Sequence, residues 1–503
     1  MTQTSFVTVV SCVLLYITWR TALNLRYKSA LRRNDCQDPP RYRHKEPFLG
    51  LDFFFGFMNA FKGGYLLDFN KAVFDEYGKT FTIDSFGTKV FKTIDPEVSK
   101  AVHATFFSHF GLQGLRYDIA THLWGNGIIV VDGSHWKHGR ALIKSSFDVV
   151  HLANMKRLQK HTNVLFDLLP KDGSTVDLAP LFKRLILDTT SEFIFGEAMG
   201  ALEDSKQCKH FMDAFEYAQR GTGIRSVLGR LKFLHRDKKW WEACKQVTDY
   251  ADKHVDRALE RLREKGVGQP RQETSRLRLV DEMAHDTQDR VTLRSHIISV
   301  FSPAHDGAAT VLTNVVFHLA RHPEIWDKLK KEIEPTKDKT LSYELLNSYQ
   351  YLEWVLKETH RLTTIATTNQ RQCVKTTVLP FGGGHDGRSP LYIQKGDLVE
   401  INYRAMGRDK SFWGDDADIF RPERWESMRP GWEYTPFGGG PRSCPGMRLV
   451  FTESTYVLVM LLRMFDRLEN RDPELEWKEE FRLTVQSKNG CIVALIPYNH
   501  KSP

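Results

Sequence analysis

The stretch that decides the fold is residues 437–446, Phe-Gly-Gly-Gly-Pro-Arg-Ser-Cys-Pro-Gly, which runs into a helical pattern over residues 447–465. Its glycines allow the backbone to approach a flat ligand closely. Cys444 stands just ahead of the helix N-terminus, where the helix dipole and free N–H groups stabilise a thiolate. An isolated cysteine is more often a small buried hydrophobic residue. In this position, however, a thiolate can ligate iron.

The composition is typical of a globular protein with a sizeable core. Of 503 residues, 41% are hydrophobic and 26% are charged, and no low-complexity linker follows the N-terminal part. One large domain is therefore expected. The net charge of +9 is not concentrated in a basic block, so it favours anionic membrane surfaces or an acidic protein partner and does not imply nucleic acid. Seven scattered cysteines without a C-x-x-C pair argue against a zinc site or a disulfide framework.

The N-terminal stretch over residues 6–19 carries no charge and is rich in Val, Leu and aromatic residues. It is short, but with its flanks a tilted helix is able to cross a thin bilayer such as that of the endoplasmic reticulum. Basic residues follow it, at Arg20, Arg26, Lys28, Arg32 and Arg33. The positive-inside rule then places the rest of the chain in the cytosol. A cleaved signal peptide is the alternative, but its charge would precede the apolar stretch.

We therefore predict a transmembrane anchor over residues 1–25 and a basic, proline-rich hinge over residues 26–47. A catalytic domain is predicted over residues 48–503, as a single-pass protein of the endoplasmic reticulum membrane. Most of this domain shows apolar residues at helical spacing, as over residues 181–195 and 292–321. Strand-like alternation is confined to short pieces. These pieces are residues 80–84, 90–94, 391–393, 398–401 and 492–496. The predicted fold class is mainly α with small β-sheets.

Three glycines, Gly382, Gly384 and Gly387, match the G-x-G-x-x-G pattern of dinucleotide-binding proteins. The context does not fit, because Pro390 and a second strand follow where a helix is required. A Gly-rich hairpin or turn is expected here, and not a nicotinamide or flavin site.

The loop around Cys444 resembles the haem loop of the cytochrome P450 family, Phe-x-x-Gly-x-Arg-x-Cys-x-Gly. Other segments follow in the family's order, so the resemblance extends from about Pro47 onward. It implies a P450 fold with haem b as cofactor and Cys444 as the ligand to the iron. Glu358 and Arg361, with Arg424 of the segment FRPERW, resemble the family's charged cluster behind the haem. Alone, E-x-x-R is more often a solvated surface ion pair.

Further residues resemble the family's contacts with the haem propionates. Trp136 and Arg140 lie four residues apart and thus on one helix face, and a buried pair of carboxylates needs such donors. Arg371 and Arg442 are further candidate partners. The predicted cofactor-binding residues are Cys444, Trp136, Arg140, Arg371, Arg442 and Phe437.

Residues 302–310 (SPAHDGAAT) resemble the family's oxygen-binding helix, with departures. The acid is kept as Asp306, but the hydroxyl residue expected beside it is replaced by Gly307; these two are the predicted catalytic positions. A water held by Asp306, or a substrate hydroxyl, must then orient the proton relay; otherwise the enzyme leaks peroxide or performs another reaction. The alternative for Asp306 is a structural pair with a neighbouring His or Arg. Pro303 is expected to deepen the helix kink, and His305 to be structural.

Pro445 is a second departure, directly after the predicted ligand. The thiolate normally accepts backbone N–H bonds from the residues that follow it, and proline has no N–H to donate. We expect a more electron-rich sulfur and a lower reduction potential of the iron.

The resemblance implies a monooxygenase that inserts one oxygen atom of O2 into a hydrophobic substrate, with electrons from a separate NADPH-cytochrome reductase. Cytochrome b5 is a second candidate donor, and membrane lipid a further partner. The chain is most similar to the fungal branch that hydroxylates alkanes and fatty acids, so the first expectation is a fatty acyl or polyketide substrate. Gly307 suggests a specialised enzyme of secondary metabolism. Candidate lining residues are Phe106, Phe107, Phe110, Leu112, Ile365, Ala366 and Val485.

Two alternatives stay open. A haem-thiolate isomerase or dehydratase rearranges an activated substrate without a reductase, and Gly307 permits such chemistry. The other alternative is a haem-binding protein without catalysis. A requirement for NADPH and reductase distinguishes the monooxygenase from the isomerase, and failure to bind oxygen when reduced would favour the non-catalytic protein.

Overall fold

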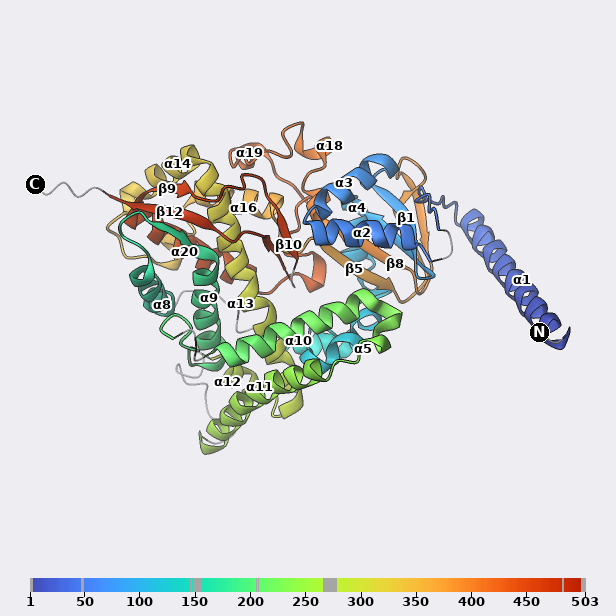
Figure 1. The fold of residues 1–503 in the computed structure, drawn as a ribbon, viewed down its shortest axis with the longest axis horizontal. Coiled ribbons are helices and arrows are strands. Elements are labelled where there is room, and N and C mark those ends of the chain that lie inside the picture. Colours follow the sequence, from blue (N-terminus) through green and yellow to red (C-terminus); the bar gives the residue numbers. More distant parts are fainter. Residues whose placement is uncertain are drawn as a thin grey trace, which may run out of the picture.

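The computed structural model describes residues 3–46, 49–144, 147, 155–204, 206, 208–265, 278–481 and 484–498. For part of the N-terminal helix it describes the backbone alone. Helices gather on one side of the molecule, and the largest sheet with its covering helices lies on the other (Figure 1). The predicted class, mainly α with small β-sheets, is confirmed.

The helices include long core helices and single turns. The longer ones are α1 (Gln3–Arg33), α2 (Leu51–Gly63), α3 (Leu66–Tyr77), α5 (Gln113–Trp124), α6 (Gly133–Lys144), α8 (Met155–Leu168), α9 (Leu178–Phe195), α10 (Lys209–Leu228), α11 (Lys238–Lys265), α12 (Leu279–Asp286), α13 (Arg290–Arg321), α14 (Pro323–Ile333), α16 (Gln350–Leu362) and α20 (Met447–Met464). The short ones are α4 (Pro96–Lys100), α15 (Tyr343–Leu346), α17 (Tyr403–Met406), α18 (Lys410–Trp413) and α19 (Arg424–Ser427).

Helix α13 is the central element of the helical part (Figure 1). It begins after Asp289, whose carboxylate accepts a hydrogen bond from Thr292 N at 3.0 Å, and it continues through Pro303 to Arg321. It packs on α9, α11, α16 and α20, and its residues from Leu293 onward are almost all buried. A helix that is buried on all sides belongs to the interior of a large domain. The helix predicted over residues 292–321 is confirmed.

The largest sheet has the order β1-β2-β8-β5-β3, in which only the β2–β8 pair among the described strands is parallel. Its strands are β1 (Thr80–Ser85), β2 (Thr88–Thr93), β8 (Leu398–Asn402), β5 (Thr368–Cys373) and β3 (Phe110–Gly111). Phe81, Phe91 and Val399 belong to the apolar core against this sheet. Arg371 pairs with Val399, so the sheet holds this arginine on its second-last strand.

Three smaller sheets complete the β structure. They are β4 (Thr175–Asp177), β12 (Ile492–Pro497) and β9 (Phe465–Asn470) in one sheet, β6 (Thr377–Gly383) with β7 (Ser389–Ile393), and β10 (Glu479–Phe481) with β11 (Val485–Ser487). In the β6–β7 hairpin, Gly382, Gly384 and Gly387 all have positive φ, and Gly382 N donates to Gly387 O at 2.7 Å. The predicted Gly-rich hairpin is confirmed.

Helix α1 extends away from the rest of the chain and continues past residue 25 to Arg33 (Figure 1). Among the described residues, no helix combines the length and the apolar character needed to cross a membrane. The predicted anchor is therefore not confirmed, and many side chains of residues 6–19 lie outside the described part.

The proline-rich segment after α1 is attached to the catalytic domain. Thr82 N donates to Pro40 O at 2.9 Å, and Tyr42 N donates to Thr82 O at 2.8 Å, so this segment pairs with β1. Gln37 N donates to Pro390 O at 3.1 Å. Of the segment expected to be a hinge, residues 26–33 thus continue helix α1 and residues 37–42 pair with strands, while Pro47 lies outside the described residues.

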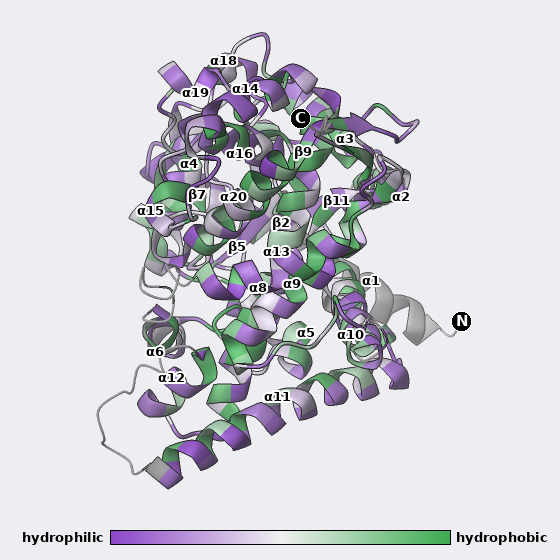
Figure 2. Cartoon of the chain, turned by 90° about the vertical axis from the view of Figure 1, so that its left-hand side faces the viewer, coloured by the Kyte–Doolittle hydropathy of each residue, from purple (hydrophilic) through white to green (hydrophobic). Residues whose placement is uncertain are grey.

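Helix α11 lies at the edge of the molecule and shows alternating apolar and polar residues in Figure 2. Its buried residues recur at intervals of three or four, as Ala251, Val255, Ala258 and Leu262 do. This spacing places one apolar face against the core and leaves the charged face outside. The polar loop predicted over residues 263–278 begins inside α11, and residues 266–277 lie outside the described part.

Candidate active site

The loop of residues 437–446 folds back on itself before α20. Cys444 N donates to Phe437 O at 2.9 Å, which closes the loop. Gly438 and Gly440 have φ of 70° and 65°, a region that favours glycine. A Cβ on Gly440 would lie 2.1 Å from the carbonyl oxygen of His103, so a larger residue does not fit there. Gly438 is therefore favoured by its backbone conformation, and Gly440 is required by both backbone conformation and close approach.

Cys444 lies three residues before α20, with its side chain exposed at the loop. Burial among nearby protein atoms nevertheless raises the pKa of its thiol. Hydrogen bonds from the N–H groups of Gly446 and Met447, and the charge of Arg140, act in the opposite direction and lower that pKa. These groups favour the thiolate, which is the form that binds a metal ion.

Under the haem ligation that the resemblance implies, replacing Pro445 by Leu is expected to raise the reduction potential of the iron. The change restores a backbone N–H next to the sulfur, and an added hydrogen bond withdraws electron density from a thiolate ligand. Potentiometric titration of the two holoproteins measures the difference. Pro170→Leu, at a proline between α8 and β4, is the control for removing a proline. An unchanged potential in Pro445→Leu would refute the expectation.

Three guanidinium groups gather around one carboxylate in the part of the site that the described residues form. Arg442 donates to Asp132 Oδ1 at 2.6 Å. The negative charge of Asp132 also opposes the lowering of the pKa values of Arg116 and Arg371 by burial. Burial and the charge of Arg116 lower the pKa of Arg371 to about 9, and burial lowers the pKa of Arg442 to about 10. Three cations facing one anion leave an excess positive charge, which favours binding of further carboxylates.

The side chains predicted to hold a cofactor come from separate elements. Trp136 of α6 is buried, and the guanidinium carbon of Arg442 lies 4.6 Å from the centre of its ring. Arg140 lies one turn further along α6. Burial lowers the pKa of its guanidinium group, and the nearby sulfur of Cys444 acts in the opposite direction. The ring of Phe437 packs on His360, with ring centres 4.8 Å apart, although its carbonyl oxygen is bonded to Cys444 N. Trp136, Arg371 and Arg442 thus form one polar and cationic wall, which Arg140, one helix turn from Trp136, extends toward Cys444.

This arrangement fits haem b. A sulfur at the head of a helix suits the iron, the glycine backbone suits a flat macrocycle, and the excess cationic charge suits two propionates. Sequence reasoning missed Arg116 of α5, which donates to Ile129 O at 2.8 Å. The sequence around Arg116 contains no motif that would have identified this arginine.

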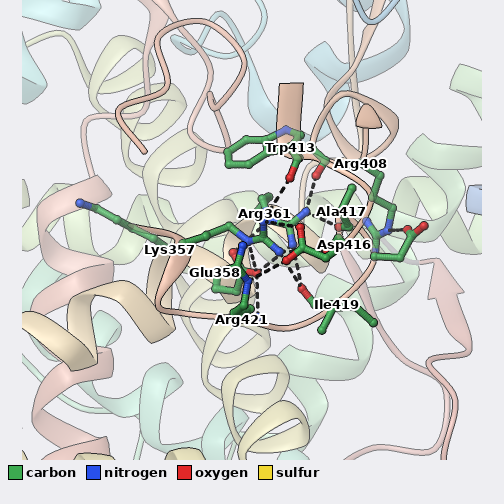
Figure 3. A network of polar contacts seen from close by, with 12 residues as sticks. Lys357, Glu358, Arg361, Arg408, Trp413, Asp416, Ala417, Ile419 and Arg421 are labelled. Atoms are coloured by element: carbon green, nitrogen blue, oxygen red, sulfur yellow. Dashed lines mark hydrogen bonds and ion pairs between the residues drawn. The ribbon is translucent and has the colours of Figure 1, made fainter. Parts of the chain in front are cut away.

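A buried charged cluster lies around Glu358 on α16 (Figure 3). Arg361 binds both carboxylate oxygens, at 2.9 and 2.8 Å, and Arg424 Nε donates to Glu358 Oε1 at 2.8 Å. Trp425 Nε1 donates to the other oxygen at 3.0 Å. The side chains of the three charged residues are fully buried. The alternative of a surface ion pair is therefore wrong.

The family model described as Cytochrome P450 matches residues 47–493. The chain belongs to the cytochrome P450 family. Proteins of this family use haem b, so haem b is the cofactor, and the protein is an oxidoreductase of the monooxygenase type.

Curated relatives cover nearly the whole P450 chain. The cytochrome P450 monooxygenase apdE of Emericella nidulans is 35% identical over 97% of this chain and 93% of its own length. The cytochrome P450 monooxygenase iccC of Talaromyces variabilis is 37% identical over 92% of this chain and 93% of its own length. Cytochrome P450 52A13 of Debaryomyces hansenii is 33% identical, with 92% of each chain covered.

Asp306 and Gly307 lie on the buried face of α13 in this P450. The carboxylate of Asp306 accepts a hydrogen bond from the Thr484 hydroxyl at 2.5 Å. Among the residues that the structure describes, the hydrogen-bond partner of Asp306 is this hydroxyl group and not a His or an Arg. His305 is structural as predicted: its Nδ1 lies 3.1 Å from Phe301 O and its ring stacks on Phe301.

The candidate substrate-lining residues fall into separate groups. Val485 N donates to Ile365 O at 3.1 Å, and a Cβ on Gly307 would lie 3.4 Å from Ile365 Cδ1. Ile365 therefore contacts Val485 through its backbone and faces Gly307 of α13 with its side chain. Phe107 packs on Trp136, with ring centres 5.4 Å apart. Of the remaining candidates, Ala366 is exposed, and the N–H of Leu112 donates to Asp132. Phe110 is part of the apolar core against the largest sheet, and Phe106 packs against that core.

Glu453 of α20 is expected to make the stability of the P450 depend on pH. Burial raises the pKa of this carboxyl from 4.5 to about 7, although Arg157 and Thr189 oppose the shift. Between pH 4.5 and 7 the folded state holds a proton that the unfolded state has lost, so stability falls as pH rises through this window, by about 3 kcal/mol. Glu453→Gln is expected to flatten this slope in urea denaturation of the holoprotein, whereas the exposed Glu203→Gln retains it. Parallel curves for Glu453→Gln and wild type would contradict the assignment.

Proposed function

We propose that this P450 inserts one oxygen atom of O2 into a C–H bond of a hydrophobic small molecule, with electrons from a separate NADPH-cytochrome reductase. Substrate, O2, two electrons and two protons give the hydroxylated product and one water. Bound haem b supplies the activation of oxygen, which a thiolate ligand promotes by favouring O–O cleavage. The observation that carries the proposal is the position of Cys444, at the head of α20 and near the cationic wall.

In this proposal the protein's residues bind, orient and deliver protons. Cys444 is the iron ligand, and Trp136 with Arg140, Arg371 and Arg442 would hold the propionates. Arg116 joins the same cationic group. The Asp306 carboxyl passes protons toward the reaction site, where general acid catalysis typically contributes about 10²–10⁴ in rate.

The proposed substrate is a fatty acyl chain or a reduced polyketide of fungal secondary metabolism. The apolar residues Ile365, which faces Gly307, and Val485, which is bonded to Ile365, support a hydrophobic substrate. The fungal sources of the related monooxygenases support the metabolic setting. We further propose attachment to the endoplasmic reticulum membrane, supported by the uncharged residues 6–19 and the basic residues after them. Membrane fractionation of the full chain and of a chain lacking residues 1–25 tests this placement.

Reconstitution tests the proposed reaction. Purified holoprotein is incubated with NADPH, the fungal reductase and a panel of fatty acyl and polyketide substrates under labelled O2. One labelled oxygen per product, formed only with reductase, is the expected result. Product without reductase would instead indicate an isomerase or dehydratase. Failure of the reduced protein to bind O2 would indicate a haem protein without catalysis.

A further inference from the structure

The hydroxyl of Thr484 joins two residues of α13 to the C-terminal part of the chain. Its Oγ1 donates to Asp306 Oδ2 at 2.5 Å and lies 3.4 Å from Thr310 Oγ1. Asp306 and Thr310 are four residues apart, so both lie on one face of the helix. A hydroxyl can donate one hydrogen bond and accept others, so Thr484 is able to serve both neighbours.

The position of Thr484 is fixed by the strand that follows it. β11 begins at Val485, whose N–H donates to Ile365 O at 3.1 Å, and β11 packs on α13. Ile365 is also the residue nearest to the missing side chain of Gly307. Thr484 therefore contacts Asp306, the residue next to Gly307, and it precedes Val485, which is bonded to the residue nearest to Gly307.

We propose that Thr484, directly before β11, provides the hydroxyl group that Gly307 lacks, and that it positions Asp306 for proton delivery. The inference rests on the proposed monooxygenase function. Each turnover consumes two protons and two electrons per O2. The Asp306 carboxyl gives up a proton on the site side and regains one from solvent, while the Thr484 hydrogen bond keeps Oδ2 in place.

The burial of Asp306 supports a dedicated role for this contact. Asp306 is only 8% exposed, and a buried carboxyl group needs a hydrogen-bond partner. Hydrogen bonds from a hydroxyl to a carboxylate are short and stronger than those between neutral groups. Thr484 is thus a positioning residue, which acts through Asp306 and not by contact with substrate.

Uncoupling is the first test, measured as hydrogen peroxide released per NADPH consumed. Thr484→Val, which removes the hydroxyl and keeps the shape, is expected to raise this ratio by about tenfold. Thr484→Ser is expected to stay close to wild type. The control is Thr313→Val, since the Thr313 hydroxyl donates to Ala309 O of its own helix at 2.8 Å. Equal peroxide release by Thr484→Val and Thr313→Val would overturn the proposal.

A rescue experiment distinguishes the loss of the hydroxyl group from a general disturbance of the structure by Thr484→Val. A Cβ at position 307 would lie 3.4 Å from Ile365 Cδ1, so the Cβ of a threonine is accommodated there. Adding Gly307→Thr to Thr484→Val is expected to bring peroxide release back toward the wild-type ratio. Persistent uncoupling in the double variant, with haem content equal to wild type, counts against the proposed replacement.

A double-mutant cycle tests the pair without turnover. The shift in urea midpoint caused by Thr484→Val is measured in wild-type holoprotein and in Asp306→Ala. We expect the shift to fall to less than half in the Asp306→Ala background, because the partner is already gone. Equal shifts would mean that the two residues do not interact. Reductase-dependent turnover of wild type with no effect of Thr484→Val defeats this inference alone, whereas no reductase-dependent turnover defeats it together with the proposed function.

Discussion

Glu358→Gln is expected to leave little folded, haem-containing protein. The change removes the charge that Arg361 and Arg424 share and leaves two fully buried guanidinium groups without their carboxylate. Breaking a buried ion pair in this way costs about 3–5 kcal/mol, against a typical total stability of about 5–15 kcal/mol. Soluble yield, haem per protein and the urea midpoint measure the loss.

Glu353→Gln is the matched control on the same helix. Glu353 pairs with Lys357 at 2.6 Å, but both side chains are partly exposed. Exposed pairs contribute about 0.2–1 kcal/mol, so haem content and yield should stay near those of wild type. If Glu358→Gln matched Glu353→Gln in both measurements, the cluster around Glu358 would not be essential for the fold.

Cys444→Ser is expected to abolish reductase-dependent product formation while the fold is kept. Serine has nearly the same size, and the loop is closed by the backbone bond from residue 444 to Phe437 O, which the substitution retains. Its hydroxyl does not ionise near neutral pH, so it provides no thiolate-type ligand. Turnover with NADPH and reductase, together with haem content and far-ultraviolet circular dichroism, measures the effect.

Cys36→Ser is the control for the loss of a sulfur. The Cys36 thiol donates to Asn34 O at 3.4 Å in the segment after α1, far along the chain from the loop of residues 437–446. Its turnover should remain that of wild type. Retention of wild-type turnover by Cys444→Ser would exclude Cys444 as the ligand.

The features predicted well from sequence are local ones. The glycines of the Cys444 loop and the three-residue spacing of Glu358 and Arg361 lie within short segments, so their geometry follows from backbone preference and helix periodicity. The long buried helix α13 was predicted for the same reason, because its apolar residues continue over residues 292–321. The burial of the Glu358 cluster required the family resemblance, since spacing alone does not distinguish a buried pair from an exposed one.

The features that sequence reasoning missed are contacts between distant segments. Thr484 and Asp306 are 178 residues apart, and no pattern near either residue indicates the pairing. The gathering of Arg116 with Arg371 likewise depends on how α5 meets β5. The segment after α1 was expected to be a hinge because of its prolines, yet free backbone groups on Thr82 of β1 bind it to the sheet.

The most direct test of the central claim is the difference spectrum of the reduced holoprotein with and without carbon monoxide. A Soret band of the thiolate-ligated type, absent from Cys444→Ser, is the predicted result and would establish Cys444 as the iron ligand. A band typical of a neutral ligand in correctly folded wild-type protein, unchanged in Cys444→Ser, would contradict the account.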